Sequence, residues 1–141
     1  MRHSLAAHYL QIKANGLNTI PKSGPLMIAA THPNSFLDAI IIASIIDRPL
    51  HFLARSDVFE AKWADFILRK LNLIPIYRLQ EGQENLSKND ITFKECYTIL
   101  EKDGAILIFV EGVSLIDMKL RPLKKGLARI AFGYAEKNDF Q

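Results

Sequence analysis

The chain has 141 residues, of which 49% are hydrophobic and 23% charged, and this is the composition of one globular domain with one core. The formal net charge of +3 is too small to indicate a nucleic-acid partner. No apolar run approaches the ~20 residues of a membrane-spanning helix, and residues 1–13 lack the pattern of a secretory signal. The single cysteine, Cys96, excludes an internal disulfide, and its neighbours at helical spacing predict a buried, unreactive side chain.

Strand and helix patterns alternate along the chain. The apolar run at 25–30 predicts a strand buried on both faces, and Pro75 places the strand at 73–77 near an edge because proline lacks a backbone donor. Asn89 or Asp90 is expected to cap the helix that follows. The predicted strands lie at 25–30, 51–54, 73–77 and 105–109, and the predicted helices at 38–46, 59–71, 89–103 and 126–137.

This alternation predicts one α/β domain over residues 1–141, with a mainly parallel sheet flanked by helices. In such sheets the loops after the strands carry the site. His32 and Asp38 follow the strand at 25–30, and Glu111 follows the strand at 105–109. On these residues alone, a hydrogen-bonded structural pair and a catalytic dyad both remain open for the histidine and the aspartate.

Three blocks follow one another between about Gly16 and Ala135. The first is His32-Pro-Asn-Ser-Phe-Leu-Asp38, and the second joins Ala54-Arg-Ser-Asp-Val-Phe59 to Leu71-Asn-Leu-Ile-Pro-Ile-Tyr-Arg78. The third is Phe109-Val-Glu-Gly-Val-Ser114, followed by Leu120-Arg-Pro-Leu-Lys-Lys-Gly126. In order and spacing these blocks resemble the lysophosphatidate and glycerol-3-phosphate acyltransferase superfamily, the His-x4-Asp family.

Three features depart from that family's usual pattern. Five residues separate His32 from Asp38 where the pattern has four, and Val113-Ser114 stands where it has Thr-Arg. The arginine that would meet an acceptor phosphate is therefore missing at that place. The family's fourth block, a strand containing Val-Pro, is expected just beyond Asn138, so the chain is expected to be a fragment truncated at its C-terminus.

The resemblance implies an O-acyltransferase of phospholipid biosynthesis. It would move a fatty acyl group from acyl-CoA or acyl-carrier protein to a hydroxyl of a glycerophosphate or lysophospholipid, with no cofactor besides that donor. His32 would act as general base, and Asp38 would orient its imidazole and stabilise the cation. Ser35 is a rival nucleophile that lacks the Gly-x-Ser-x-Gly elbow, and bonding within the loop is its simpler role.

The other candidate residues would bind substrate. Glu111 and Gly112 would contact the acceptor head group, or cap local amides instead. Arg78 would contact a phosphate, and Arg55 is a weaker candidate of the same kind. The candidate substrate-binding residues are Ser35, Arg78, Glu111, Gly112, Lys124 and Lys125.

Several readings remain open beside the enzyme. The basic run of Lys119, Arg121, Lys124, Lys125 and Arg129 is either a solvated face or a surface for phosphates of a substrate or an anionic membrane. The apolar helix at 39–46 either packs in the core or lines an acyl tunnel.

The expected location is peripheral, on the cytoplasmic face of a membrane, without a transmembrane segment. A non-catalytic lipid-binding module and a thioester hydrolase are the rival functions, and the histidines show no metal-binding spacing.

Overall fold

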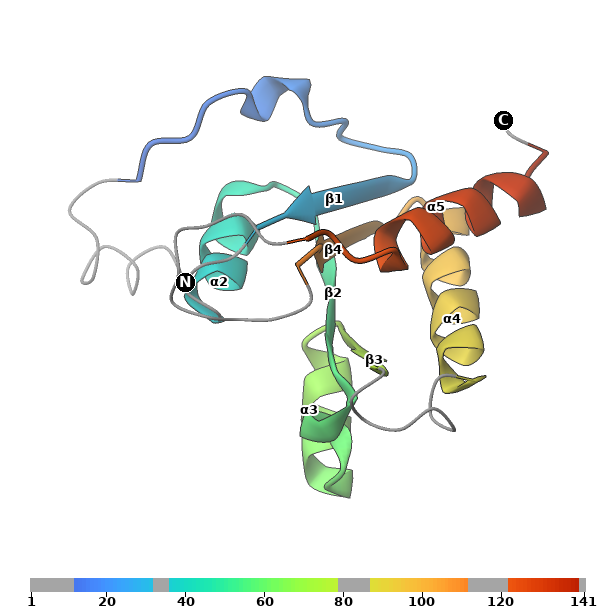
Figure 1. Ribbon diagram of the computed structural model, residues 1–141. Helices are drawn as coiled ribbons and strands as arrows, with labels where there is room; N and C mark the ends of the chain where they lie inside the picture. Colours follow the sequence, from blue (N-terminus) through green and yellow to red (C-terminus); the bar gives the residue numbers. More distant parts are fainter. Residues whose placement is uncertain (1–11, 32–35, 79–86, 112–121, 140–141) are drawn as a thin grey trace.

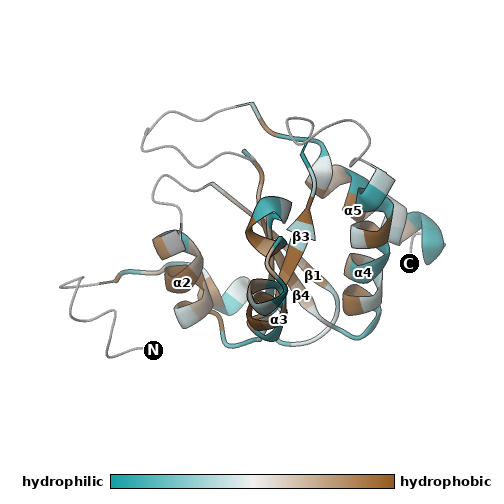
Figure 2. Ribbon diagram, turned by 90° about the horizontal axis from the view of Figure 1, so that it is seen from below, coloured by the Kyte–Doolittle hydropathy of each residue, from teal (hydrophilic) through white to brown (hydrophobic). Residues whose placement is uncertain are grey.

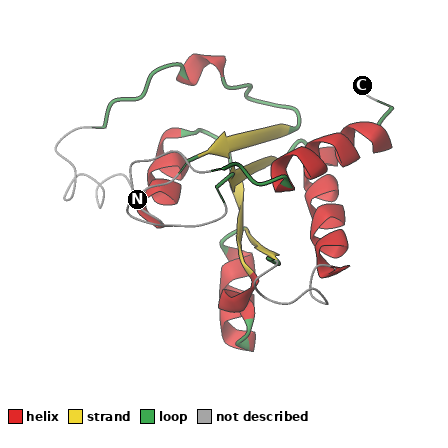
Figure 3. Ribbon diagram, viewed as in Figure 1, coloured by secondary structure: helices red, strands yellow, loops and turns green. Residues whose placement is uncertain are grey.

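The computed structural model describes residues 12–31, 36–78, 87–111 and 122–139. Its strands form one sheet of four strands in the order β1-β4-β2-β3 (Figures 1 and 3). Every pairing in this sheet is parallel, and the predicted α/β architecture is confirmed. The strands are β1 (Leu26–Ala30), β2 (Leu50–Arg55), β3 (Leu73–Ile76) and β4 (Ala105–Phe109).

Helices lie on both sides of the sheet, with α2 on one side and α4 and α5 on the other (Figures 1 and 2). Because side chains alternate along a strand, β4 contributes side chains to the core on both sides of the sheet. Ile106 and Ile108 pack in the cluster that includes α4 and α5, whereas Leu107 packs in the cluster that includes Ile42 of α2. The helices are α2 (Phe36–Ile45), α3 (Lys62–Lys70), α4 (Asn89–Glu101) and α5 (Gly126–Lys137), with short 3-10 helices η1 (Leu17–Thr19) and η2 (Ser56–Phe59).

Cys96 of α4 lies in the centre of the larger core cluster. Its side chain is fully buried, and burial raises the pKa of its thiol to about 12. The thiol is therefore protonated at neutral pH, and the predicted unreactive small side chain is confirmed. Thr92, one turn earlier, is also buried, and its hydroxyl donates to the carbonyl oxygen of Pro75 at 2.8 Å, which ties α4 to β3.

The two outer strands of the described sheet differ in how well they were predicted. β3 is an edge strand, as Pro75 indicated. β1 was predicted to be buried on both faces, and this is wrong: in the described part of the chain it pairs with β4 alone, its residues are partly exposed, and Ala29 is exposed. An apolar run alone therefore did not distinguish an outer strand from a central one.

The beginnings of two helices also differ from expectation. Phe59 lies in η2, and the predicted amphipathic helix begins only at Lys62. Asn89 does not cap α4. Its Oδ1 accepts a hydrogen bond from the Tyr77 amide at 2.9 Å and its Nδ2 donates to the Tyr77 carbonyl oxygen at 2.8 Å. The side chain thus fixes the chain that leaves β3, and Lys88 occupies the N-cap position of α4 without a side-chain bond.

Among the helices that the structure describes, none has the length and apolar character needed to cross a bilayer.

Candidate active site

The carboxyl ends of β1 and β4 lie side by side. Ala30 pairs with Phe109 in the sheet, and the Val110 amide donates to the Ala30 carbonyl oxygen at 3.1 Å. Adjacent strands are about 4.8 Å apart, so the segments that follow these strands leave the sheet from neighbouring positions. Those segments carry His32 and Glu111, which come from two of the three sequence blocks.

Asp38 lies in the first turn of α2, which begins at Phe36. The positive end of the helix dipole favours a carboxylate there. The side chain of Asp38 is partly buried. His32, Ser35 and Gly112 lie outside the described residues, so the proposed His32–Asp38 dyad stays a prediction.

Among the predicted substrate contacts that lie in the described ranges, Glu111 alone is buried. Glu111 follows β4 directly. A buried carboxylate is costly unless it is hydrogen-bonded or paired. The described part of the basic run returns to this point, because the Lys124 amide donates to the Val110 carbonyl oxygen at 2.7 Å. Lys124 and Lys125 are exposed there, immediately before α5. The structure therefore brings the start of the third block and the later lysines together at the end of β4.

Arg78 lies two residues beyond β3 and is partly buried, near the end of β2. Arg55 is the last residue of β2, and its Nε donates to Asp57 Oδ1 at 3.1 Å while its terminal nitrogen bonds Oδ2. The hydrogen bond from Arg55, together with the positive charges of Arg55 and Arg78, holds the pKa of Asp57 below its usual value. Asp57 thus pairs with Arg55 at the carboxyl end of β2, and the charge of Arg78 also acts on it.

Sequence reasoning missed the role of Asp57. The signal was present, because an arginine that ends a strand and an aspartate two residues later can form a forked ion pair. A cavity of about 460 Å³ lies against this cluster, and its lining includes Asp57, Tyr77 and Lys88.

Since β2 separates β4 from β3, Arg78 is two strands from Glu111, or about 10 Å in the sheet direction. That span suits a substrate with a head group and a reacting hydroxyl, and both ends would lie at one edge of the sheet.

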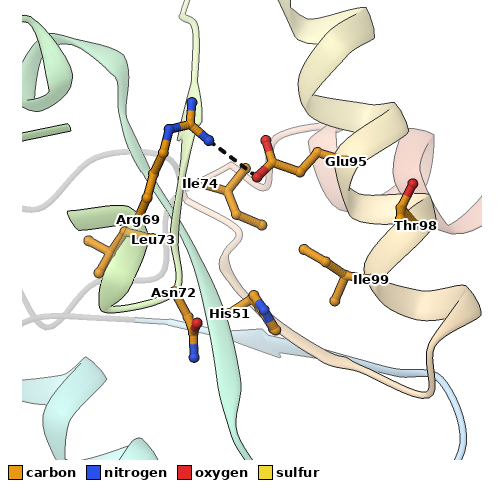
Figure 4. A pocket seen from close by; sticks show the side chains of 8 residues that line it. All are labelled: His51, Arg69, Asn72, Leu73, Ile74, Glu95, Thr98 and Ile99. Carbon is orange, nitrogen blue, oxygen red and sulfur yellow. Dashed lines mark hydrogen bonds and ion pairs between the residues drawn. The ribbon is translucent and has the colours of Figure 1, made fainter. Parts of the chain in front are cut away.

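A second cavity, of about 300 Å³, lies at the opposite edge of the sheet (Figure 4). His51 is near the start of β2 and Asn72 precedes β3, so the cavity lies at the amino ends of these strands. Arg69 of α3 and Glu95 of α4 close one side with an ion pair of 3.3 Å. Arg69 lines both cavities, but none of the predicted site residues that the structure describes lines this one.

Known proteins resemble the chain over most of its length. A family model described as Acyltransferase matches residues 11–134. A 1-acyl-sn-glycerol-3-phosphate acyltransferase of Bacillus subtilis (strain 168) is 25% identical over 121 residues, which are 85% of this chain and 56% of that protein. The chloroplastic 1-acyl-sn-glycerol-3-phosphate acyltransferase BAT2 of Brassica napus is 25% identical over 116 residues, which are 82% of this chain and 32% of that protein. No solved structure matches. The chain thus spans about half and about a third of the lengths of these two relatives.

Proposed function

The chain belongs to the acyltransferase family, and from this premise we propose that it transfers a fatty acyl group from a thioester to a hydroxyl of a glycerolipid acceptor. The pairing of β1 with β4 carries the proposal, because the strands that precede the His32 block and the Glu111 block in the sequence are neighbours in the sheet. Both similar enzymes are named for transfer to 1-acyl-sn-glycerol-3-phosphate, which supports an acceptor of the same class.

The proposed reaction needs a base, a hydroxyl and a thioester. His32 takes the proton of the acceptor hydroxyl as the oxygen attacks the thioester carbonyl carbon. The tetrahedral intermediate then collapses, the carbon–sulfur bond breaks, and the imidazolium returns the proton to the departing thiolate. Asp38 holds the imidazole in the correct tautomer and stabilises its cationic form. Because the acceptor hydroxyl is itself the nucleophile, Ser35 forms no acyl-enzyme and serves the loop and the substrate through hydrogen bonds.

The charged residues at this edge suit substrates that carry phosphate. In the described ranges, Arg55 and Arg78 are the arginines at the ends of β2 and β3, where they can take the role of the arginine that Val113-Ser114 replaces. A guanidinium can hold a phosphate with two parallel bonds, which a lysine cannot do. Glu111 and Gly112 would contact the acceptor head group.

The proposed donor is acyl-CoA or acyl-carrier protein, and both carry phosphate. Lys124 and Lys125 at the end of β4 offer a phosphate two more positive charges. The proposed acceptor is a glycerophosphate or a lysophospholipid. The proposed location is peripheral, on the cytoplasmic face of a membrane.

Replacing the base tests the proposal directly. His32→Ala should lower the rate of acyl transfer about 10²- to 10⁴-fold, because general base catalysis contributes that much. Asp38→Asn should lower it similarly. The matched control is His51→Ala, since His51 lines the cavity at the opposite edge and should leave the transfer rate unchanged. The measurement is formation of acylated acceptor from acyl-CoA, with circular dichroism to show that each variant is folded. A folded His32→Ala protein with the parent's rate would refute the proposal.

The products also distinguish the rival functions. A thioester hydrolase releases free fatty acid without any acceptor, whereas the proposed transferase needs the acceptor before it consumes the thioester. A lipid-binding module would bind vesicles and cleave no thioester. Measuring free thiol and free fatty acid, with and without glycerol-3-phosphate or lysophosphatidate, therefore separates the three.

A further inference from the structure

α3 turns its hydrophobic side toward solvent. Trp63 is 72% exposed and Phe66 61%, and Ile67 and Leu71 are exposed beside them. Residues three and four apart lie on one side of a helix, so these four form one surface, here called the α3 apolar face. Ala64 and Leu68, on the adjoining side of α3, are partly buried. Soluble monomers rarely leave such a group of large apolar side chains uncovered unless the surface binds something.

The position of Lys70 indicates which kind of partner can cover the α3 apolar face. Its ammonium group lies 4.3 Å from the centre of the Phe66 ring, among the apolar side chains rather than across the helix from them. A dry protein partner would have to bury this charge, and burying an unpaired ammonium group is costly. At a bilayer surface, by contrast, aromatic rings enter the boundary of head groups and acyl chains while a lysine reaches up to the phosphates.

The charges along α3 point the same way. Asp65 is the acidic residue of this helix, and it lies away from the apolar face, where Arg69 Nε donates to its Oδ1 at 2.9 Å. The apolar face therefore presents Lys70, with Lys62 at the start of the helix, and no carboxylate of α3. This charge is complementary to anionic phospholipid head groups.

We propose that the α3 apolar face docks on an anionic phospholipid bilayer. This inference rests on the proposed function, since a lipid acceptor has to leave a membrane to reach the site. η2 and α3 follow directly from the carboxyl end of β2, beside Arg55 and Asp57. Docking through α3 would therefore hold the edge of the sheet that carries the arginines close to the lipid surface.

Trp63 provides the direct measurement, because it is the chain's single tryptophan. We expect its emission to move to shorter wavelength when the whole chain is mixed with vesicles of phosphatidylglycerol and phosphatidylcholine in equal parts. Phe66→Ser combined with Ile67→Ser keeps this reporter and should lower vesicle affinity at least about tenfold, because two apolar side chains no longer leave water. Lys70→Gln should lower it about fivefold on these vesicles and little on pure phosphatidylcholine.

The matched control is Phe132→Ser. Phe132 of α5 is as exposed as the α3 side chains, at 69%, and its helix begins directly after Lys124 and Lys125 of the basic run. Its replacement should leave vesicle affinity unchanged. If Phe132→Ser weakens binding as much as the double α3 variant does, α5 is the docking element and the proposal is wrong.

Other outcomes would also overturn the proposal. An unchanged Trp63 spectrum with vesicles means that the face does not meet lipid. Emission already at short wavelength without vesicles means that the face is covered by protein: by a second copy if the shift depends on concentration, and by a segment of the same chain if it does not.

Activity on soluble substrates separates this proposal from the proposed function. With a short-chain thioester and glycerol-3-phosphate, the Phe66→Ser, Ile67→Ser variant should keep the parent's rate, whereas His32→Ala should lose it. Vesicle binding without any acyl transfer by the parent would refute the proposed function and leave the docking surface standing.

Discussion

α4 and α3 are both amphipathic helices, yet they bury their apolar sides very differently. In α4, Cys96 and Leu100 are almost completely buried against the sheet and α5. In α3, Trp63 and Phe66 face solvent, and the helix packs against β3 and η2. Figure 1 shows the consequence: α4 lies beside α5, whereas α3 extends away from the rest of the fold.

Periodicity identifies the apolar side of a helix but not what that side contacts. A three- and four-residue spacing indicates that one stripe avoids water, and a core, a partner or a lipid surface can each satisfy it. In α4 the core satisfies it, and stability should depend on those residues. In α3 the stripe is uncovered, and stability in water should be indifferent to it.

The largest expected effect comes from truncating a leucine in each region. Leu100 is 1% exposed and Leu71, directly after α3, is 59% exposed. Leu100→Ala should lower the free energy of unfolding by about 2–5 kcal/mol, because it removes buried methyl groups and leaves a cavity. Leu71→Ala should change it by less than about 0.5 kcal/mol. Urea denaturation followed by circular dichroism measures both, and equal losses would mean that α3 is packed as tightly as α4.

A smaller effect is expected where α4 is tied to the sheet by a hydrogen bond. Thr92→Val keeps the shape of the side chain but removes the donor to the Pro75 carbonyl oxygen, and should cost about 1 kcal/mol. Thr98→Val on the same helix is the control, since its exposed hydroxyl bonds only back to Lys94 within the helix. That variant should stay within about 0.5 kcal/mol of the parent. Indistinguishable stabilities for the two valine variants would show that this bond does not anchor α4.

Much of this contrast could be predicted from the sequence, and the rest could not for physical reasons. The apolar run at 105–109 and the spacing around Cys96 depend on local pattern, and both gave the correct element and the correct burial. The spacing at 62–70 gave the helix but not the direction of its apolar side, because that depends on which elements pack against it. The exposure of β1 depends on strand order, which no local pattern contains.

The same distinction holds for the candidate site. The two blocks after β1 and β4 were recognisable because each is a short continuous segment with its own spacing. The effect of Arg78 on the pKa of Asp57, by contrast, depends on the pairing of β2 with β3. Residues brought together by strand order, rather than by distance along the chain, could be located only once the sheet was known.

The smallest effect is expected where the two regions touch. Arg69 of α3 and Glu95 of α4 form an ion pair at 3.3 Å, and both side chains are more than a third exposed. Exposed pairs contribute little, because water screens the charges and two long side chains lose freedom. Arg69 also bonds Asp65, so single substitutions would mix two interactions. A double-mutant cycle of Arg69→Gln and Glu95→Gln isolates the pair.

Its coupling free energy should be below about 1 kcal/mol and should fall toward zero in about 1 M salt, where screening acts within ~3 Å. A coupling above about 2 kcal/mol that survives salt would mean that α3 is held to α4 as firmly as α4 is held to the sheet. The helix would then be a fixed part of the core layer, and the contrast between the two helices would lie only in their outward side chains. A weak, salt-sensitive coupling leaves α3 anchored mainly by β3 and η2, so that changes to its apolar face can alter binding without altering the fold.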